Sequence, residues 1–272
     1  MQVVATLSLK GGVGKTTVAL GLVGAAQQHG VRTLLVDLDP QANATIALDV
    51  GPTTATVADV LDEPRRSVVR RAITPSGWGE FLDVLVGTEE TERHNHPDPR
   101  PKLMGKLARA LQRLHDPDDP DDPDGERYRL VVVDCPPSLG LLTRSALAAA
   151  QRAVLVTDPT MFAVLGVQRA FDAVQSERHD NPDLQPLGVL INRVRSRNAE
   201  HEFRIAELRE LFGPLVFSAM LPDRSAVQQA QGACTPIQRW DTPGAREVSA
   251  VFSALLGRVL RSARPRHTGV TT

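Results

Sequence analysis

The 272-residue sequence contains no apolar run of about 18 residues or more, although 42% of its residues are hydrophobic. No segment therefore has the composition of a membrane-spanning helix. The opening residues, MQVVATLSLKGG, lack a basic region followed by a long apolar segment, so we expect no secretory signal. We also find no internal repeat and no interdomain linker. We therefore expect one domain over residues 1–264, followed by a flexible tail at 265–272.

Cysteine is scarce, with only Cys135 and Cys234 in the chain. The two are far apart and form no CxxC pair, so the sequence offers neither a disulfide framework nor a structural zinc motif. This usage indicates a reduced protein of the cytoplasm.

Lysine is scarce as well. Of the 31 basic residues only four are lysines, and two of them, Lys10 and Lys15, stand in one short segment near the N-terminus. The net charge of −1 argues against a bulk polycation. The segment from Arg193 to Arg266, however, contains 12 Arg and only 7 Asp or Glu, so the C-terminal third is locally basic. This excess fits either a solvated arginine-rich surface or a surface that contacts an anionic partner.

What the chain does contain is a series of short apolar segments that alternate with helical patterns. We expect strands at 2–8, 31–39, 129–137, 152–159, 186–194 and 214–221, and helices at 17–29, 141–151, 164–177 and 199–212. These strands are continuously apolar, as is typical of strands covered on both faces. The sequence therefore predicts the α/β class: a doubly wound, mostly parallel sheet flanked by helices.

One segment departs from this pattern. Residues 116–125, DPDDPDDPDG, form an acidic, proline-rich tract that suits neither a helix interior nor a central strand. We expect a surface loop immediately before the strand at 129–137.

Residues 7–20, LSLKGGVGKTTVAL, have the pattern of a phosphate-binding loop between a strand and a helix. Gly11, Gly12 and Gly14 allow the backbone to bend so that its N–H groups point inward at phosphate oxygens. The helix that follows directs its positive dipole end to the same place. Lys15 can reach the β- and γ-phosphates, and the Thr16 hydroxyl can ligate Mg²⁺. The motif therefore predicts a nucleotide phosphate with Mg²⁺, held by residues 11–17, which also include Val13 and Thr17.

Two features of this loop depart from the standard pattern. Leu9 stands where the first glycine belongs, and Lys10 precedes the glycines. A lysine on the rising arm of the loop would struggle to fold back onto its own nucleotide. It could instead face phosphates bound by another subunit, in a role similar to that of an arginine finger.

Polar residues end several of the predicted strands. Asp37 and Asp39 follow the second strand, and Asp134 ends an all-apolar run, LVVV. Ligands of doubly wound sheets bind at this edge, and a carboxylate after such a run needs a partner, for which Mg²⁺ is the natural candidate. Asn192 ends a later strand, where its amide could read an adenine edge.

Several of these segments together resemble the ParA/MinD/Soj family of P-loop ATPases. KGGVGKTT is similar to the deviant Walker A motif of that family, VDLDPQANAT (36–45) to its second motif and VVVDCPPSLG (131–140) to its Walker B region. GVLINRV (188–194) and LPDRSAVQQAQGACTPI (221–237) are similar to its adenine-side segments. The expected first strand begins at residue 2 and leaves no room for an N-terminal helix-turn-helix, as in the short ParA/Soj branch.

The resemblance implies roles for these residues. Lys10 would contact the nucleotide of the opposite subunit in an ATP-bound sandwich dimer, while Lys15 holds its own. Asp39 would position the attacking water, and Asp37 would help Thr16 and Asp134 hold the Mg²⁺ shell. The base would lie near Asn192, Pro222 and Asp223, although ordinary turn chemistry explains Pro-Asp equally well.

The resemblance also implies nonspecific DNA binding by the ATP dimer, association with the nucleoid and stimulation by a ParB-like protein. Arg193, Arg195 and Arg197 alternate after the Asn192 strand, as phosphate contacts would. A second position that contacts DNA in the Soj branch is Ala226 here, and Arg224 is close enough to compensate.

Alternatives within and near the family remain. A MinD-like membrane protein would need an amphipathic C-terminal anchor, and residues 246–262 do carry an apolar stripe, which we interpret as core-facing. The two lone cysteines do not form the paired motif of an iron–sulfur scaffold. One tyrosine, Tyr128, does not make the tyrosine-rich tail of a bacterial tyrosine kinase. An amidoligase-type ATPase is a more distant alternative.

Overall fold

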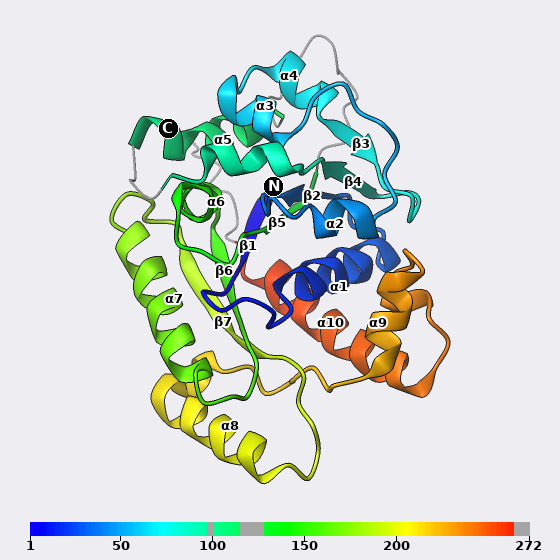
Figure 1. Cartoon of the computed structure of the whole chain (residues 1–272), viewed down its shortest axis with the longest axis vertical. Coiled ribbons are helices and arrows are strands. Elements are labelled where there is room, and N and C mark those ends of the chain that lie inside the picture. Colours follow the sequence, from blue (N-terminus) through cyan, green and yellow to red (C-terminus); the bar gives the residue numbers. More distant parts are fainter. Residues whose placement is uncertain (97–100, 115–127, 264–272) are drawn as a thin grey trace, which may run out of the picture.

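The computed structural model describes residues 1–96, 101–114 and 128–263, so the acidic tract 116–125 and the tail 265–272 lie outside the described residues. Its centre is a seven-stranded sheet with strand order β3-β4-β2-β5-β1-β6-β7 (Figure 1). Neighbouring strands are parallel except β3 and β4, which confirms the mostly parallel sheet. The strands are β1 (Gln2–Leu7), β2 (Thr33–Asp37), β3 (Ile73–Pro75), β4 (Leu82–Leu85), β5 (Leu130–Asp134), β6 (Arg152–Thr157) and β7 (Gln185–Ile191).

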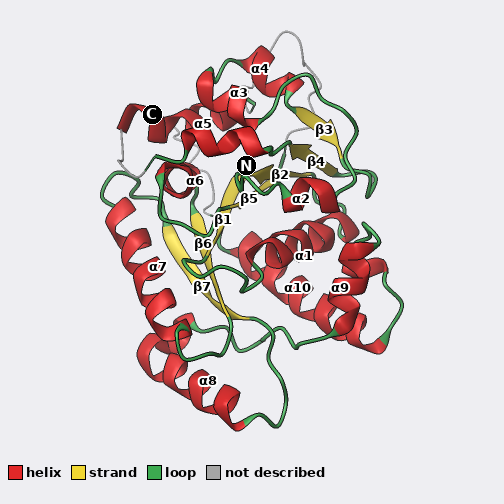
Figure 2. Cartoon of the chain, viewed as in Figure 1, coloured by secondary structure: helices red, strands yellow, loops and turns green. Residues whose placement is uncertain are grey.

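Helices cover both faces of this sheet (Figure 2). One face packs against α1 (Lys15–Gln28), α2 (Asn43–Ala47), α9 (Ser225–Gly232) and α10 (Pro243–Arg261). The other packs against α3 (Val57–Asp62), α4 (Arg66–Arg71), α5 (Pro101–Arg113), α6 (Leu141–Ala149), α7 (Ala163–Glu177) and α8 (Ala199–Phe212). Successive residues of β1 alternate between these two cores, since Val3 and Ala5 face one and Val4 faces the other. The doubly wound prediction is therefore confirmed.

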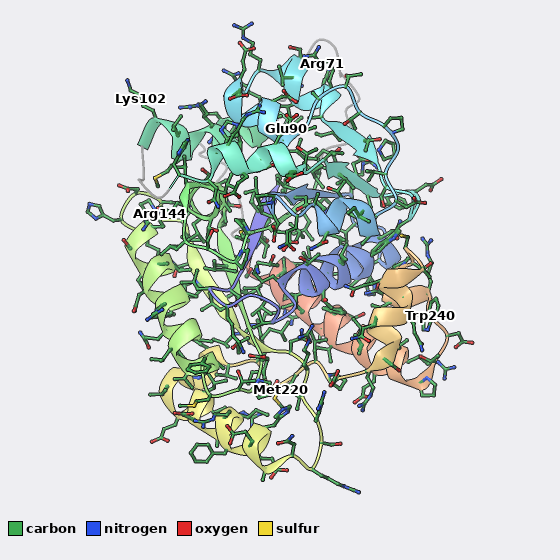
Figure 3. All side chains as sticks on the ribbon, in the orientation of Figure 1. Arg71, Glu90, Lys102, Arg144, Met220 and Trp240 are labelled. Atoms are coloured by element: carbon green, nitrogen blue, oxygen red, sulfur yellow. The ribbon has the colours of Figure 1, made fainter. Side chains whose placement is uncertain are left out.

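The expected strand at 214–221 is wrong. Residues Gly213–Leu215 form a short 3-10 helix, η2, and the rest of the segment touches the sheet through an isolated bridge between Val216 and Val189. Leu215 comes so close to β7 that its carbonyl would lie 2.5 Å from a Cβ placed on Gly188. The chain continues past Met220 (Figure 3), and the Leu221 N–H donates to the Ile191 carbonyl at the end of β7 over 2.9 Å.

The region between residues 43 and 113 holds elements that the sequence did not predict. Helices α2 to α5, the short strands β3 and β4, and the 3-10 helix η1 (Glu89–His94) all lie there. A further 3-10 helix, η3 (Ile237–Arg239), precedes α10. Except for α5, these elements have three to six residues, and a strand of three or four residues carries too little pattern to be distinguished from a turn.

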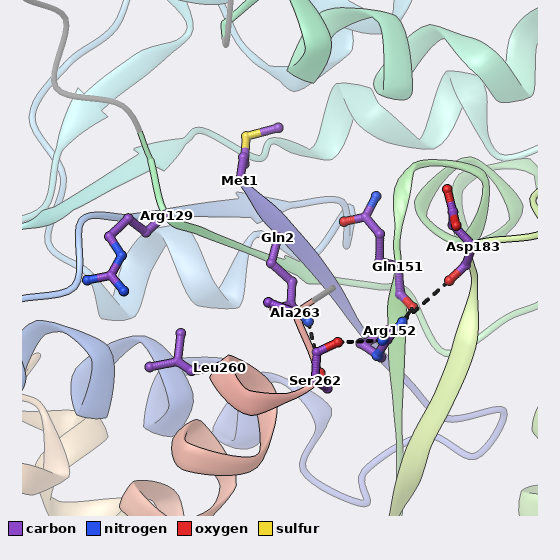
Figure 4. Close-up of a pocket in the computed structure, with 9 residues that line it drawn as sticks. All are labelled: Met1, Gln2, Arg129, Gln151, Arg152, Asp183, Leu260, Ser262 and Ala263. Atoms are coloured by element: carbon purple, nitrogen blue, oxygen red, sulfur yellow. Dashed lines mark hydrogen bonds between the residues drawn. The ribbon is translucent and has the colours of Figure 1, made fainter. Parts of the chain in front are cut away.

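Because the strands are parallel, their amino-terminal ends lie together along one edge of the sheet and their carboxyl-terminal ends along the opposite edge. These two edges differ chemically. A cavity of about 420 Å³ lies at the amino-terminal edge, where Gln2 donates to the Ser262 hydroxyl over 3.0 Å (Figure 4). Arg129, Arg152 and Leu260 also line it. This cavity is at the opposite end of β1 from the phosphate loop, so it is not the predicted nucleotide site. The predicted polar residues gather at the carboxyl-terminal edge instead.

Candidate nucleotide site

The phosphate loop connects the end of β1 to the first residue of α1. Gly12 and Gly14 have φ values of 77° and 92°, the left-handed region that glycine adopts without strain. A Cβ on Gly14 would also lie 2.2 Å from the amide nitrogen of Asn192. Both glycines are therefore required by the backbone. Val13 is fully buried and holds the loop against the core below α1.

Asn192 fixes the loop from the neighbouring end of β7. Its amide nitrogen donates to the Val13 carbonyl over 2.8 Å, and its amide oxygen accepts from the Arg193 N–H. The structure thus places Asn192 at the phosphate loop, and its contact with adenine stays a prediction. The predicted base-side residues Pro222 and Asp223 lie beside Val194, to which Asp223 donates its backbone N–H over 2.9 Å.

Lys15 and Thr16 begin α1, and both reach the carboxylate of Asp134. Lys15 is only 6% exposed, and its positive charge lowers the pKa of Asp134. The Thr16 hydroxyl lies near the same carboxylate and also lowers its pKa. The first turn of the helix, its lysine and its hydroxyl therefore converge on one point at the end of β5.

Asp37 and Asp134 lie side by side, because they are paired residues of the neighbouring strands β2 and β5. Both are fully buried. Burial, together with the charge of the adjacent Asp37, raises the pKa of Asp134 to about 7. Burial likewise raises the pKa of Asp37 to about 6, although hydrogen bonds from Thr45 oppose the shift. Two adjacent buried carboxylates are costly to ionise together, so the pair favours a bound proton or a bound cation.

The oxygens of these carboxylates are used unequally. Asp37 accepts from the Thr45 N–H at 2.8 Å and the Thr45 hydroxyl at 2.9 Å. One oxygen of Asp134 accepts from Thr6, while its Oδ2 is buried without a hydrogen-bond partner. That orphaned oxygen beside the Thr16 hydroxyl fits a divalent cation.

The donor set also indicates which cation. Across the described ranges, no group of three His, Cys, Asp or Glu side chains is arranged to hold a metal. A site with one free carboxylate oxygen and one hydroxyl suits Mg²⁺, which keeps several waters and shares phosphate oxygens. Cys135, directly after Asp134, is buried and its pKa is raised by that burial, so it is a packed thiol.

Asp39 lies next to this pair and is slightly more exposed than either member. It is 7% exposed, and its carboxylate accepts from the Gln41 N–H over 3.0 Å. Its own N–H donates to Asp37. Asp39 thus lies at the rim of the site, where a water molecule could reach it.

Lys10 points away from its own loop. Its ammonium donates to both oxygens of Asp158, at 2.9 and 3.1 Å, and to the Thr160 hydroxyl at 2.8 Å. Asp158 follows β6, which pairs with β1 on the side away from β5. The side chain of Lys10 is one-third exposed. Sequence reasoning missed Asp158 and Thr160, because only the strand order brings TDPT at 157–160 beside the loop.

The four predicted DNA-binding arginines lie on two neighbouring segments after β7, and two of them form ion pairs. Arg195 contacts Asp223 at 2.7 Å, and Arg224 contacts Glu247 at 2.8 Å. Arg193 and Arg197 are exposed, with left-handed φ values of 57° and 60°. The segments 193–197 and 221–224 are neighbours in space, joined through Val194 and Pro222. Ala226, the departure from the Soj pattern, is buried.

None of the described helices combines the length and apolar character needed to cross a bilayer. The apolar stripe of α10 faces the core, as expected. Its buried members are Val248, Phe252, Leu255, Leu256 and Val259.

Comparison with known proteins agrees with this geometry. Residues 1–185 match the family described as AAA domain. The chain is 32% identical over 244 residues to the chromosome partitioning protein ParA of Caulobacter vibrioides, covering 89% of this chain and 88% of that protein. It is 30% identical over 245 residues to the sporulation initiation inhibitor protein Soj of Bacillus subtilis, covering 88% and 91%.

Solved structures show the same fold. A cobyrinic acid a,c-diamide synthase from Mycobacterium smegmatis, with bound ADP and magnesium, has a TM-score of 0.77 and 27% identity, covering 97% of each chain. The cell division ATPase MinD of Pyrococcus furiosus has a TM-score of 0.73, with 22% identity over 96% of this chain and 99% of that one. With the deviant phosphate loop and the paired strand-end carboxylates, the ParA and Soj relatives show that the chain belongs to the ParA/MinD family of P-loop ATPases.

Proposed function

We propose that this chain is an ATP-dependent partitioning or positioning ATPase of the ParA type. It binds ATP with Mg²⁺, forms a sandwich dimer around the nucleotides, holds DNA without sequence preference and releases it after hydrolysis. The observation that carries the proposal is the direction of Lys10, which leaves its own loop while Lys15 turns into it. Two lysines with opposite directions fit a site completed by a second copy.

The chain's own groups divide the chemistry. Backbone N–H groups of residues 11–14 and the start of α1 bind the phosphates, and Lys15 neutralises their charge. Thr16 and the free oxygen of Asp134 would hold Mg²⁺, which when bound screens the charge of the phosphate oxygens. Asp39 orients the attacking water from the rim. Phosphoryl transfer needs positioning and charge more than covalent chemistry, and these residues supply both.

Lys10 would couple assembly to turnover. In the single chain its ammonium is held by Asp158 and Thr160, at the surface beside the loop. A second copy docked there brings its own nucleotide phosphates to this ammonium. The nucleotide pocket of a single chain lacks the Lys10 ammonium that the partner supplies. Hydrolysis therefore depends on dimerisation.

DNA binding would use the surface of Arg193, Arg195, Arg197 and Arg224. The two exposed residues, Arg193 and Arg197, are ready to contact phosphates. Arg195 and Arg224 first have to exchange Asp223 and Glu247 for phosphate oxygens. Such contacts carry no sequence information and weaken with salt. A dimer doubles the number of contacts, which makes retention on DNA dependent on ATP.

The direct test is ATP hydrolysis by the purified protein, alone, with duplex DNA, and with DNA plus a candidate ParB-like partner. We expect slow turnover alone and faster turnover with both additions. Hydrolysis that never responds to DNA or to a partner would contradict the partitioning role.

The relatives suggest two other outcomes to measure in parallel. MinD-like membrane association predicts ATP-dependent flotation with liposomes, which the buried stripe of α10 disfavours. The structural relative named a diamide synthase suggests a second alternative, in which the enzyme uses ATP to form an amide on a small carboxylic acid. In that case ATP would be consumed only when the carboxylic acid is added.

A further inference from the structure

The cavity at the amino-terminal edge of the sheet lies at the opposite end of β1 from the phosphate loop (Figure 4). It is found where β1, β5 and β6 begin and where α10 ends, and we refer to it as the amino-edge cavity. Arg129 directly precedes β5, Arg152 begins β6, and Ser262 follows α10. Its volume of about 420 Å³ is within the range of about 300–1,000 Å³ that is typical of small-molecule sites. A cavity of this size can hold a small organic molecule.

Two guanidinium groups give the amino-edge cavity a positive wall. Arg129 is exposed, and across the described residues its side chain makes no hydrogen bond or ion pair. Arg152 donates to the backbone carbonyls of Gln151 and Asp183, at 2.7 and 3.4 Å, and also to that of Ser262. The described lining holds these two arginines and one acidic side chain, that of Asp183, so its side chains carry one net positive charge. Because a guanidinium fork matches the geometry of a carboxylate or a phosphate, this wall suits an anion.

The Gln2 side chain adds a buried acceptor to the same wall. Gln2 is 6% exposed, and its amide nitrogen donates to the Ser262 hydroxyl over 3.0 Å. Its Oε1 is buried and has no hydrogen-bond partner among the described groups. A buried polar atom without a partner is unfavourable, so a donor on a bound molecule would stabilise it. This unpaired oxygen favours a ligand that carries a hydroxyl group.

Apolar side chains complete the lining. Met1, Leu260 and Ala263 contribute carbon surface beside the polar groups, and Figure 4 shows Leu260 and Arg129 on the same side of the view. Met1 and Leu260 are half-buried and pack against the two cores of the sheet. Sites for small molecules commonly combine apolar surface with a few polar groups that fix orientation. The lining therefore suits a molecule with an apolar body.

We propose that the amino-edge cavity binds a small organic anion that has an apolar body and a hydroxyl group. The charged group is a carboxylate or a phosphate, and it pairs with the free guanidinium of Arg129. The hydroxyl donates to Oε1 of Gln2, and the apolar body lies against Leu260. The nucleotide site is at the other edge of the sheet, so this inference goes beyond the proposed function and does not depend on it.

Four probes separate the charge, the hydroxyl and the type of anion. The compound 4-hydroxyphenylacetate carries a carboxylate, a ring and a hydroxyl, phenylacetate lacks the hydroxyl, and 4-hydroxyphenylacetamide lacks the charge. Phenyl phosphate replaces the carboxylate by a phosphate. Binding to the full chain is measured by isothermal titration calorimetry at low salt and checked by saturation-transfer NMR. Mg²⁺ and a nonhydrolysable ATP analogue are present throughout, so that the nucleotide site is already filled.

Variants at exposed positions locate the binding. Arg129→Met removes the guanidinium, and its matched control is Arg169→Met on α7, an exposed arginine that does not line the cavity. Ala263→Trp places a large ring at the cavity, and thermal unfolding checks that each variant folds like wild type. We expect wild type to bind 4-hydroxyphenylacetate with a Kd below about 1 mM. Arg129→Met and Ala263→Trp should bind it at least about tenfold more weakly, and phenylacetate should bind wild type about fivefold more weakly.

Each outcome supports or overturns the inference. Comparison of phenyl phosphate with phenylacetate shows which anionic group the site prefers, and either preference supports an anion site. If the neutral amide binds as tightly as the acid, or if Arg129→Met binds like wild type, the cavity is not an anion site and the inference is wrong. Binding that Ala263→Trp leaves unchanged would place the probes elsewhere, and the absence of any binding below about 10 mM would also overturn the inference. None of these results changes the proposed function, which is tested by ATP hydrolysis.

Discussion

Replacing Asp134 by Asn tests the physical state of the carboxylate pair before any ligand arrives. Burial raises the pKa of Asp134 from an ordinary value of 3.8 to about 7, and the neighbouring Asp37 contributes. Between about pH 4 and pH 7 the folded protein therefore holds a proton that the unfolded chain releases. Stability contributed by this proton is present below pH 4 and is lost as the pH rises through 7.

The size of the effect follows from the shift. A rise of about three pKa units corresponds to about 4 kcal/mol above both pKa values. Asn keeps the shape of the protonated carboxyl but changes its hydrogen bond with Thr6 and its contact with Thr16. We therefore expect Asp134→Asn to stabilise the ligand-free protein by on the order of 3 kcal/mol at pH 8. For a chain of this size that is roughly 6–12 °C in melting temperature.

The assay is thermal unfolding in EDTA at several pH values, with the exposed Asp172→Asn on α7 as the control. The gain of Asp134→Asn should disappear near pH 4, and Asp172→Asn should show no gain at any pH. Mg²⁺ with ATP should raise the melting temperature of wild type and raise that of Asp134→Asn much less. A variant that is destabilised equally at pH 4 and pH 8 would refute the reasoning.

Four further substitutions test separate parts of the account. Gly14→Ala should lower the free energy of unfolding by about 1–3 kcal/mol, because its Cβ meets Asn192 at a positive φ, and denaturant unfolding measures this; normal stability would show that the loop adapts. Asp39→Ala should trap an ATP-bound dimer with turnover reduced by orders of magnitude, and a mild loss of rate would mean that another group orients the water. Arg197→Ala should reduce the dependence of DNA affinity on log salt by about one unit per protomer, whereas an unchanged slope would remove it from the interface. Asp158→Asn should release Lys10 and strengthen ATP-dependent dimerisation up to about fivefold by sedimentation, and weaker dimerisation would mean that the pair persists in the dimer.

Much of the fold could be predicted because its central strands are continuously apolar. The strands that become β1, β2, β5, β6 and β7 were each recognisable, and so were the helices between most of them. The segment 214–221 shows the limit. It has the composition of a strand, yet Gly213 and Pro214 begin a 3-10 helix and the chain makes only isolated bridges with the sheet.

The candidate site divides in the same way. The phosphate loop and the strand-end carboxylates are local patterns, so the sequence places them. Thr45 and Asp158 could not be predicted from a local pattern, because their roles depend on which strands become neighbours and where α2 begins. Similarly, the sequence shows that Arg195 and Arg224 are basic, but only the fold pairs them with Asp223 and Glu247.

The central claim is that a lysine from a second copy completes each nucleotide pocket. The most direct measurement is sedimentation of wild type and Lys10→Ala with Mg²⁺ and a nonhydrolysable ATP analogue, with analogue binding measured on the same samples. The account predicts that both proteins bind the analogue, that wild type forms a dimer and that Lys10→Ala remains a monomer without turnover. A Lys10→Ala protein that dimerises and hydrolyses ATP at the wild-type rate would contradict it.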